Sequence, residues 1–251
     1  MNKKAKAELI YSLLSDKPLS NYYNQPISDN DELYYSAKSA ILCCKFQDYN
    51  RLYIITHDKV DLLLLFKQLS NGKYVVNYPA KRSNIEFDEL LMSLGFKHIK
   101  TYQRMSTTNI SAWSNINEIQ YANNNDINDI IYLLNVDSGF VNYLDYLPNE
   151  NELKELIKRK GVIVNRVDGH VNGVIIYEVF GKRFYLRLWM DKSGNGLKLL
   201  FDVHTVMKEA GATYVYWWVD SNNKDVIKIH KFMRGKLDGL NDYIFFNDLN
   251  K

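Results

Sequence analysis

The stretch Asp191–Gly211 constrains the fold more than any other part of this 251-residue chain. It follows the apolar, strand-like run Phe184–Met190 and opens with the glycine-spaced turn Ser193–Gly196. Apolar residues recur at helical spacing through Leu197–Ala210, and Gly211 stands where a left-handed helix cap is expected. A strand, a glycine turn and a helix in this order present unpaired backbone N–H groups at one point. The stretch favours a phosphate or pyrophosphate site, although two such glycines taken alone more often mark a tight turn.

The residues after this stretch continue the alternation of strands and helices. Thr213–Val219 is rich in aromatic and β-branched residues and predicts a second strand. The polar turn Asp220–Asn223 contains residues that commonly cap helices, and the helical pattern Lys224–Met233 follows it. The run Leu237–Phe246 predicts a β-hairpin near the end of the chain.

This order of elements resembles the C-terminal half of the GNAT superfamily, the acyl-CoA-dependent N-acyltransferases. Gly194 and Gly196 match the two glycines of that family's pyrophosphate loop, and Asn223 matches the Asn that precedes its last helix. The sequence departs from the family at three places, one of which is Arg234-Gly235 where Gly-Phe usually closes the last helix. Asp191 stands at the first loop position, where Gln or Arg is usual, and His230 stands where Tyr is usual.

The first half of the chain shows a similar order without a glycine turn. Its run Leu90–Met105 resembles the family's last helix and final strands, and it keeps the Gly95-Phe96 pair that reads Arg234-Gly235 in the second half. Nothing within His57–Leu62 would wrap a pyrophosphate with backbone amides. We therefore interpret residues 1–110 as a degenerate GNAT-like repeat that does not bind the coenzyme. Generic α/β elements without repeat ancestry are the alternative.

The fold class predicted is α/β with a mixed sheet, a GNAT-like fold in two tandem copies: a degenerate N-terminal domain, 1–110, and an acyl-CoA-binding domain, 111–251. The patterns of the first half predict helix Lys3–Leu14, loop Pro18–Asp31, a hairpin of Ser39–Phe46 with Leu52–Asp58, helix Val60–Leu69, strand Tyr74–Tyr78 and helix Asn84–Leu94. Those of the second half predict a connection at Ser106–Asn117, strand Glu118–Tyr121, helices Asp126–Leu134 and Glu150–Lys160, and a hairpin turning at Asp168-Gly169.

Charge and cysteine usage exclude several classes of protein. The 32 basic and 29 acidic residues leave a net charge of +3, too small to imply a nucleic-acid or membrane partner. No apolar run approaches the ~20 residues that span a bilayer, and the N-terminus lacks a signal-peptide pattern. Cys43 and Cys44 are adjacent, which fits reduced thiols and a cytoplasmic setting. The histidines and cysteines have no metal-ligand spacing.

The resemblance implies that acetyl-CoA, or another acyl-CoA, serves as co-substrate and that an amine attacks its thioester directly. It implies an oxyanion donor among the backbone N–H groups of Leu188–Met190. His230 would protonate the departing thiolate as an imidazolium, and Glu178 or Asp191 would act as base through water. The residues expected to bind the coenzyme are Leu188, Trp189, Met190, Lys192, Ser193, Gly194, Asn195, Gly196, Leu197 and Asn223.

Other functions stay open at this point. A GNAT-like scaffold that binds an acyl-CoA or a partner without turnover would explain the departures at Asp191 and His230. An aminoacyl-tRNA donor is a third reading, which the modest net charge and the glycine loop disfavour. The acceptor is a small-molecule or peptide amine held between residues 140–146 and 241–245, where Asp145 or Asp242 would face an ammonium group. A homodimer is left open.

Overall fold

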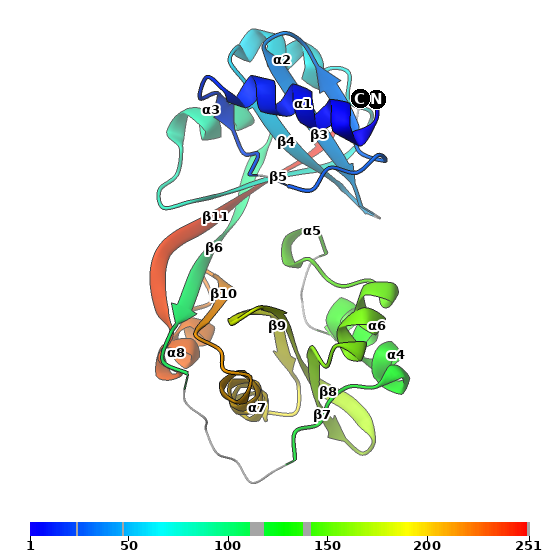
Figure 1. Cartoon of the computed structure of the whole chain (residues 1–251), viewed down its shortest axis with the longest axis vertical. Coiled ribbons are helices and arrows are strands. Elements are labelled where there is room, and N and C mark those ends of the chain that lie inside the picture. Colours follow the sequence, from blue (N-terminus) through cyan, green and yellow to red (C-terminus); the bar gives the residue numbers. More distant parts are fainter. Residues whose placement is uncertain (24, 47, 111–117, 138–141, 250–251) are drawn as a thin grey trace. The chain divides into compact units, whose positions relative to one another are not determined.

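The computed structural model describes residues 1–249 except 24, 47, 111–117 and 138–141 (Figure 1). Its contacts divide the chain into two compact units. The first unit is Met1–Tyr102 with Leu240–Lys251, and the second unit is Gln103–Gly239. The chain end thus joins the first unit, whereas the sequence assigns it to the second domain; the domain boundary near residue 110 stays a prediction.

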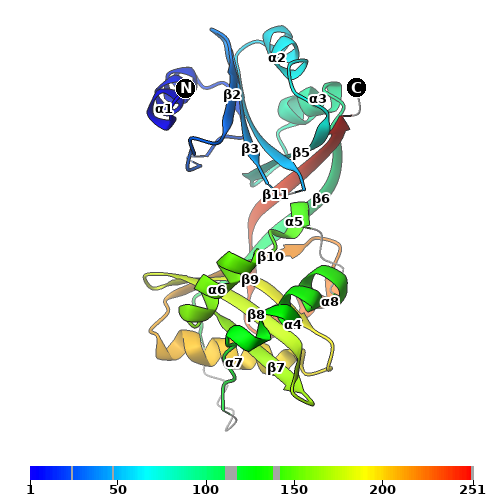
Figure 2. The same cartoon turned by 90° about the vertical axis from the view of Figure 1, so that its right-hand side faces the viewer.

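The first unit is a sheet covered on both faces by helices (Figure 2). Its strand order is β2-β3-β4-β5-β11, and β1 pairs with β4. Helix α1 packs on one face, and α2 with α3 pack on the other. The elements are α1 (Lys3–Leu14), β1 (Leu19–Ser20), β2 (Glu32–Tyr35), β3 (Ser39–Lys45), β4 (Asn50–Thr56), α2 (Lys59–Phe66), β5 (Gly72–Ala80), α3 (Ile85–Ser93) and β11 (Lys236–Leu249).

The second unit repeats this layered arrangement with the strand order β6-β10-β9-β8-β7. Helices α4 and α6 pack on one face, and α7 with α8 pack on the other. The elements are β6 (Lys97–Thr107, which begins in the first unit), the 3-10 turn Asn124–Asp126, α4 (Ile127–Tyr132), the π-helical turn Leu133–Asp137, α5 (Asn142–Asp145), α6 (Glu150–Lys158), β7 (Val162–Val167), β8 (His170–Phe180), β9 (Arg183–Asp191), α7 (Gly196–Glu209), β10 (Tyr214–Asp220) and α8 (Lys224–Phe232).

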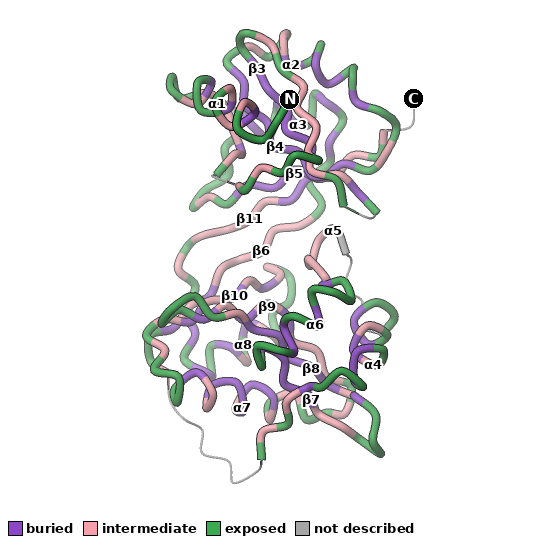
Figure 3. Tube along the Cα trace, turned by 45° about the vertical axis from the view of Figure 1, so that its right-hand side comes forward, coloured by how far each residue is buried: buried purple, intermediate pink, exposed green. Residues whose placement is uncertain are grey.

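Local sequence signals explain where many of these elements begin and end. Asn84 caps α3 by accepting a hydrogen bond from Phe87 N at 3.2 Å. The predicted hairpin turn is confirmed, because Asp168 and Gly169 take φ angles of 52° and 85° between β7 and β8. Gly211, at φ 68°, confirms the left-handed cap after α7. Figure 3 shows that the buried residues concentrate in the strands and in the helix faces against them.

Two strand predictions are wrong. The predicted hairpin Leu237–Phe246 is a single strand, β11, that pairs with β5 from Asn241↔Ala80 to Leu249↔Gly72. Gly239 takes a φ of 85° without reversing the chain, and the pairing with β5 begins two residues later, at Asn241. The predicted strand Glu118–Tyr121 shrinks to one bridge, Tyr121↔Ile163. The predicted loop Pro18–Asp31 contains β1, and residues 111–117 of the predicted connection lie outside the described residues.

Candidate functional site

The candidate site begins where two parallel strands of the second unit stop pairing. β9 and β10 pair from Arg183↔Tyr214 to Leu186↔Trp217, and both strands then continue without each other. At the same point, Ile176 on β8 pairs with Leu188 while Tyr177 pairs with Leu186. Arg187 is therefore the extra residue of a β-bulge, a feature that re-aims a strand.

The β8–β9 ladder shows which β9 amides face the unpaired side. Lys192 N donates to Asn172 O at 2.8 Å, so residues 192 and 172 form a hydrogen-bonded pair. Such pairs alternate along an antiparallel ladder, so the N–H groups of Leu188 and Met190 face β8. The N–H of Trp189 faces the β10 side, where the ladder with β10 has ended. Of the three predicted N–H donors, Leu188–Met190, only that of Trp189 therefore faces the side where β10 no longer pairs.

The turn after β9 is held by one hydroxyl group. Ser193 Oγ donates to Asp191 Oδ1 at 2.8 Å and accepts from Asn165 Nδ2 at 2.7 Å. It also accepts from Asn195 N at 3.3 Å. Asn165 belongs to β7, and nothing in the sequence pattern marks it as a partner of the turn.

Steric constraints explain why glycine occupies both positions 194 and 196 of the turn. Gly194 takes a φ of 80°, which favours glycine. A Cβ on Gly196 would lie 3.0 Å from the indole ring of Trp189, so the start of α7 rests against that ring. The match to the family's two glycines therefore has a local physical basis.

The N-terminus of α7 is uncapped. Asn195 stands at the N-cap, but its side chain accepts no cap hydrogen bond, and the first turn holds no acidic residue. The N–H groups of Gly194, Gly196 and Leu197 have no acceptor within the described ranges. Leu197 is 44% exposed, so these donors lie near solvent. Free donors at a helix N-terminus suit an anion such as a phosphate.

Several buried nitrogen atoms near this helix also lack partners. In the part of the chain that the structure describes, the indole Nε1 atoms of Trp189 and Trp217 and both ring nitrogens of His204 have no hydrogen bond. His204 lies on α7, and the two indoles come from β9 and β10. Such atoms call for water or a ligand group, which is compatible with a ligand beside α7.

His230 lies in the same interior, against both indole rings. Its ring centroid is 4.7 Å from that of Trp217 and 5.7 Å from that of Trp189. Burial, with a smaller contribution from His204, lowers the pKa of His230 to about 3. The ring is therefore neutral near neutral pH, which disfavours the imidazolium that the sequence interpretation assumes. Its part in catalysis stays a prediction.

Glu178 is held by a guanidinium group. It lies 3.5 Å from Arg187 Nη1, which also contacts Glu152 at 2.5 Å. Arg187 further donates to Tyr146 O at 2.5 Å and so ties the bulge of β9 to the region before α6. The role of Glu178 as base stays a prediction, and no sequence pattern points to Arg187.

The remaining predicted residues are a helix cap, an exposed lysine and a carboxylate of the first unit. Asn223 caps α8 by accepting a hydrogen bond from Val226 N at 3.1 Å, and its contact with a coenzyme stays a prediction. The side chain of Lys192 is exposed. Asp242 belongs to the first unit, where Asn77 Nδ2 donates to both of its carboxylate oxygens at 3.0 and 3.1 Å. Residues 140 and 141 of the predicted acceptor wall lie outside the described residues.

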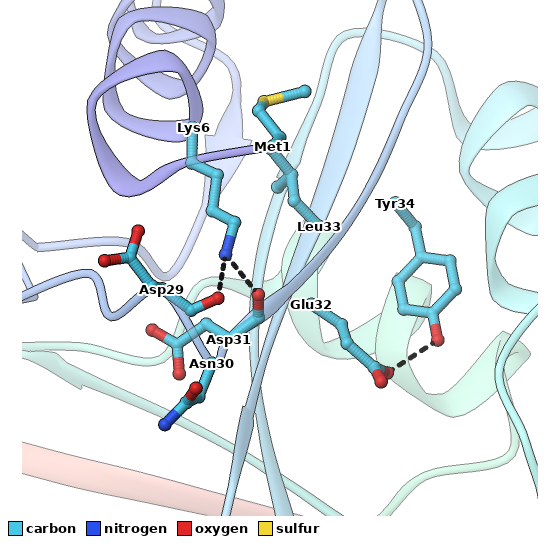
Figure 4. Close-up of a pocket in the computed structure, with 8 residues that line it drawn as sticks. All are labelled: Met1, Lys6, Asp29, Asn30, Asp31, Glu32, Leu33 and Tyr34. Atoms are coloured by element: carbon cyan, nitrogen blue, oxygen red, sulfur yellow. Dashed lines mark hydrogen bonds between the residues drawn. The ribbon is translucent and has the colours of Figure 1, made fainter.

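A separate cavity of about 390 Å³ lies in the first unit (Figure 4). Lys6 Nζ donates to the carbonyl oxygens of Ser28, Asp29 and Asp31 at 3.2, 2.8 and 2.5 Å. The ammonium thus ties α1 to the loop before β2 and is fully used in doing so. The cavity is lined by Met1, Lys6, Asp29, Asn30, Asp31, Glu32, Leu33 and Tyr34.

Neither a metal cluster nor a membrane span is found in the described ranges. No three histidine, cysteine, aspartate or glutamate side chains gather there as metal ligands would. Each helix in those ranges is too short or too polar to cross a bilayer.

Solved structures resemble the chain, whereas no protein-family model and no curated protein sequence matches it. A GCN5-related N-acetyltransferase from Sphaerobacter thermophilus is 10% identical, with a TM-score of 0.60 over 85% of this chain and 78% of the other. An acetyltransferase of the GNAT family from Colwellia psychrerythraea is 14% identical, with a TM-score of 0.55 over 99% and 98%. A tandem GNAT protein from the clavulanic acid biosynthesis pathway is 8% identical, with a TM-score of 0.53 over 86% and 82%.

The chain has the GNAT fold. Its length and its mixed sheet also fit a tandem GNAT, since the tandem protein matches over most of both chains. The fold prediction is therefore confirmed. The turn between β9 and α7 holds Gly194 and Gly196, and their binding of a pyrophosphate stays a prediction.

Proposed function

We propose that the second unit is an acyl-CoA-dependent N-acyltransferase, most simply one that moves an acetyl group to an amine. The observation that carries this proposal is the uncapped N-terminus of α7, placed directly after a strand that has lost its pairing with β10. The GNAT fold of the neighbours supports the same class of donor.

The residues of the turn fit the charged end of such a donor. The N–H groups of Gly194, Gly196 and Leu197 would hold the pyrophosphate, with Ser193 fixing the turn and the exposed Lys192 adding positive charge. The unpaired edge of β9 at Trp189 would donate to an amide or carbonyl oxygen of the pantetheine arm or the thioester.

The chemistry proposed is direct attack of a neutral amine on the thioester carbonyl. The backbone N–H of Trp189 would stabilise the oxyanion, and Glu178 or Asp191 would take the amine proton through water. Because His230 is neutral, we propose that it stabilises the departing thiolate by donating a hydrogen bond.

Titration calorimetry and thermal shift with acetyl-CoA test the binding step. We expect the coenzyme to raise the melting temperature. Leu197→Asp places a carboxylate in the first turn of α7 and is expected to weaken binding at least about tenfold, through repulsion of the pyrophosphate. Val60→Asp also replaces an apolar residue by Asp, at the second residue of α2, and should leave affinity unchanged. No thermal shift at millimolar coenzyme contradicts the proposal, as does an equal loss in both variants.

A second candidate is a GNAT-like protein that binds an acyl-CoA without turnover. The low pKa of His230 and the acidic Asp191 at the first loop position favour it. Coenzyme binding without thiol release against a panel of small-molecule and peptide amines would select this candidate. Thiol release that depends on the amine would exclude it.

For either candidate, the cytoplasm is the compartment we infer. Cys43 and Cys44 are free thiols, and the pKa of both is raised to about 12, first of all by burial. Unreactive free thiols are ordinary in a reducing compartment, where acyl-CoA is also available. Localisation of a tagged full chain by fractionation tests this.

A further inference from the structure

The first unit contains a parallel strand pair that, like β9 and β10, stops pairing before its strands end. β4 and β5 are parallel and pair only at Asn50↔Tyr74 and Arg51↔Val75. β4 then continues to Thr56 and β5 to Ala80. As in the second unit, the parallel ladder ends early and leaves backbone groups for another partner.

A segment of the chain itself takes up that edge of β4. β1 pairs antiparallel with β4 at Leu19↔Thr56 and Ser20↔Ile55, on the side of β4 opposite to β3. The next residue, Asn21, is 3% exposed and donates its backbone N–H to Ile54 O at 3.2 Å.

The side-chain amide of Asn21 then joins the two strands. Its Nδ2 donates to Leu52 O on β4 and to Asn77 O on β5, both at 3.0 Å. Its Oδ1 accepts from Ile54 N at 2.6 Å. This primary amide uses both donors and its acceptor, as an inserted peptide-like group would.

The N-terminus of α2, the helix that follows β4, is also capped by a side chain of the protein itself. The carboxylate of Asp58 accepts from Val60 N at 3.0 Å and from Asp61 N at 3.3 Å, and Asp61 adds a second negative charge to the first turn. The corresponding residues of α7 are Asn195, which makes no cap bond, and Leu197 and Lys198. A carboxylate on helix N–H groups satisfies them and repels a further anion.

We propose that the first unit carries its own ligand: Asn21 and Asp58 occupy the places that, on the proposed function, the amide-bearing arm and the pyrophosphate of an acyl-CoA occupy in the second unit. The full chain consequently binds one acyl-CoA. The first unit depends on Asn21 to hold β4 and β5 together.

A reciprocal exchange of cap residues tests the stoichiometry on the full chain with coenzyme A in a calorimeter. We expect one coenzyme-binding site in the wild type. Asp58→Asn should also have one site, with an affinity within about twofold of the wild-type value. Asn195→Asp gives α7 the cap of α2 and should weaken binding at least about tenfold. Two sites in the wild type, or an undiminished site in Asn195→Asp, overturn the proposal while leaving the acyltransferase proposal standing.

Hydrogen exchange tests the role of Asn21 without any coenzyme. Asn21→Ala should make the amides of β4 and β5, Ile54 above all, exchange at least about tenfold faster, with the second unit unchanged. Asn21→Asp keeps the shape and the acceptor for Ile54 but loses both donated bonds, so it should still speed exchange in β5. Ser20→Ala is the control. Wild-type protection in both Asn21 variants overturns the proposal, whereas a wild type that binds no coenzyme contradicts only the acyltransferase proposal.

Discussion

The two units build the same strand–helix–strand element and complete it differently. In β4–α2–β5, the side chains of Asn21 and Asp58 satisfy the strand edges and the helix N-terminus. In β9–α7–β10, the helix N-terminus has no side-chain cap, and the indole nitrogens of Trp189 and Trp217 have no partner among the described residues. Because buried polar groups are nearly always satisfied, this difference supports the proposal that only the second unit holds a ligand.

Among the substitutions, the largest effect on stability is expected where the last helix of each unit ends. A Cβ on Gly235 would lie 2.5 Å from the ring of Trp217 and 2.8 Å from the carbonyl oxygen of His230. The corresponding residue after α3 is Phe96, which packs in the core of the first unit. Gly235→Val should therefore lower the free energy of unfolding of the second unit by about 3 kcal/mol.

Urea unfolding followed by tryptophan fluorescence measures this change. All four tryptophans lie within residues 103–239, so the signal reports on the second unit. Gly181→Ala is the control, because its Cβ would meet no atom and only its φ of 64° opposes it, at about 1 kcal/mol. Equal losses in the two variants would show that the space around Gly235 does not limit the side chain.

The next difference between the units is expected at acidic pH, where the free energy of unfolding of the second unit should fall. Burial lowers the pKa of His204 to about 4, and burial with His204 lowers that of His230 to about 3. The unfolded chain protonates both rings below about pH 6.5. The contribution of the two neutral rings to the free energy of unfolding is fully present above that pH. It falls as the pH drops from 6.5 to 4, by about 3 kcal/mol per histidine. His204→Leu should remove one such loss in tryptophan-monitored unfolding across pH; an unchanged slope contradicts this.

The same titration should act with the opposite sign in the first unit. Burial raises the pKa of Asp242 to about 6, against the hydrogen bonds from Asn77 that lower it. Stability from this group is full below about pH 4 and is lost as the pH rises through 6. Asp242→Asn should flatten the pH dependence of exchange in β5 and β11. A pH dependence equal to that of the wild type would assign it to another group.

Helix ends and turns were predictable from the sequence, whereas contacts between distant segments were not. Asn84, Gly211 and the turn at Asp168-Gly169 act within a few residues, so their types alone indicate the local backbone. The position of β11 beside β5 depends on a partner far along the chain, whereas the local pattern of Leu237–Phe246 alone predicts a hairpin. The bridge made by Asn21 is invisible in sequence for the same reason, because an isolated Asn in a polar stretch indicates only a turn.

A smaller effect is expected from the hydroxyl groups that hold the two helix-starting turns. Ser193→Ala removes the bonds to Asn165, Asp191 and Asn195 and should weaken coenzyme binding about threefold to tenfold, with about 1 kcal/mol of stability lost. Thr56→Val is the match in the first unit, where the hydroxyl bonds to both N and O of Asp58. It should cost similar stability and no affinity. Calorimetry on both variants decides, and a loss of affinity in Thr56→Val would contradict the assignment.

The smallest effect concerns the residues that end α3 and α8. Gly95 takes a φ of 86°, while Arg234 takes 63° at the corresponding place, and each N–H bonds back at 3.0 Å, to Met92 O and Lys231 O. A left-handed backbone costs a residue with a Cβ roughly 1 kcal/mol. Arg234→Gly should therefore raise the free energy of unfolding of the second unit by about 0.5 kcal/mol, after the loss of the 3.1 Å hydrogen bond from Arg234 to Asn109. Arg234→Ala loses that bond but keeps the Cβ, so it should be the less stable of the two; equal stability would mean that the two helix ends carry no difference in strain.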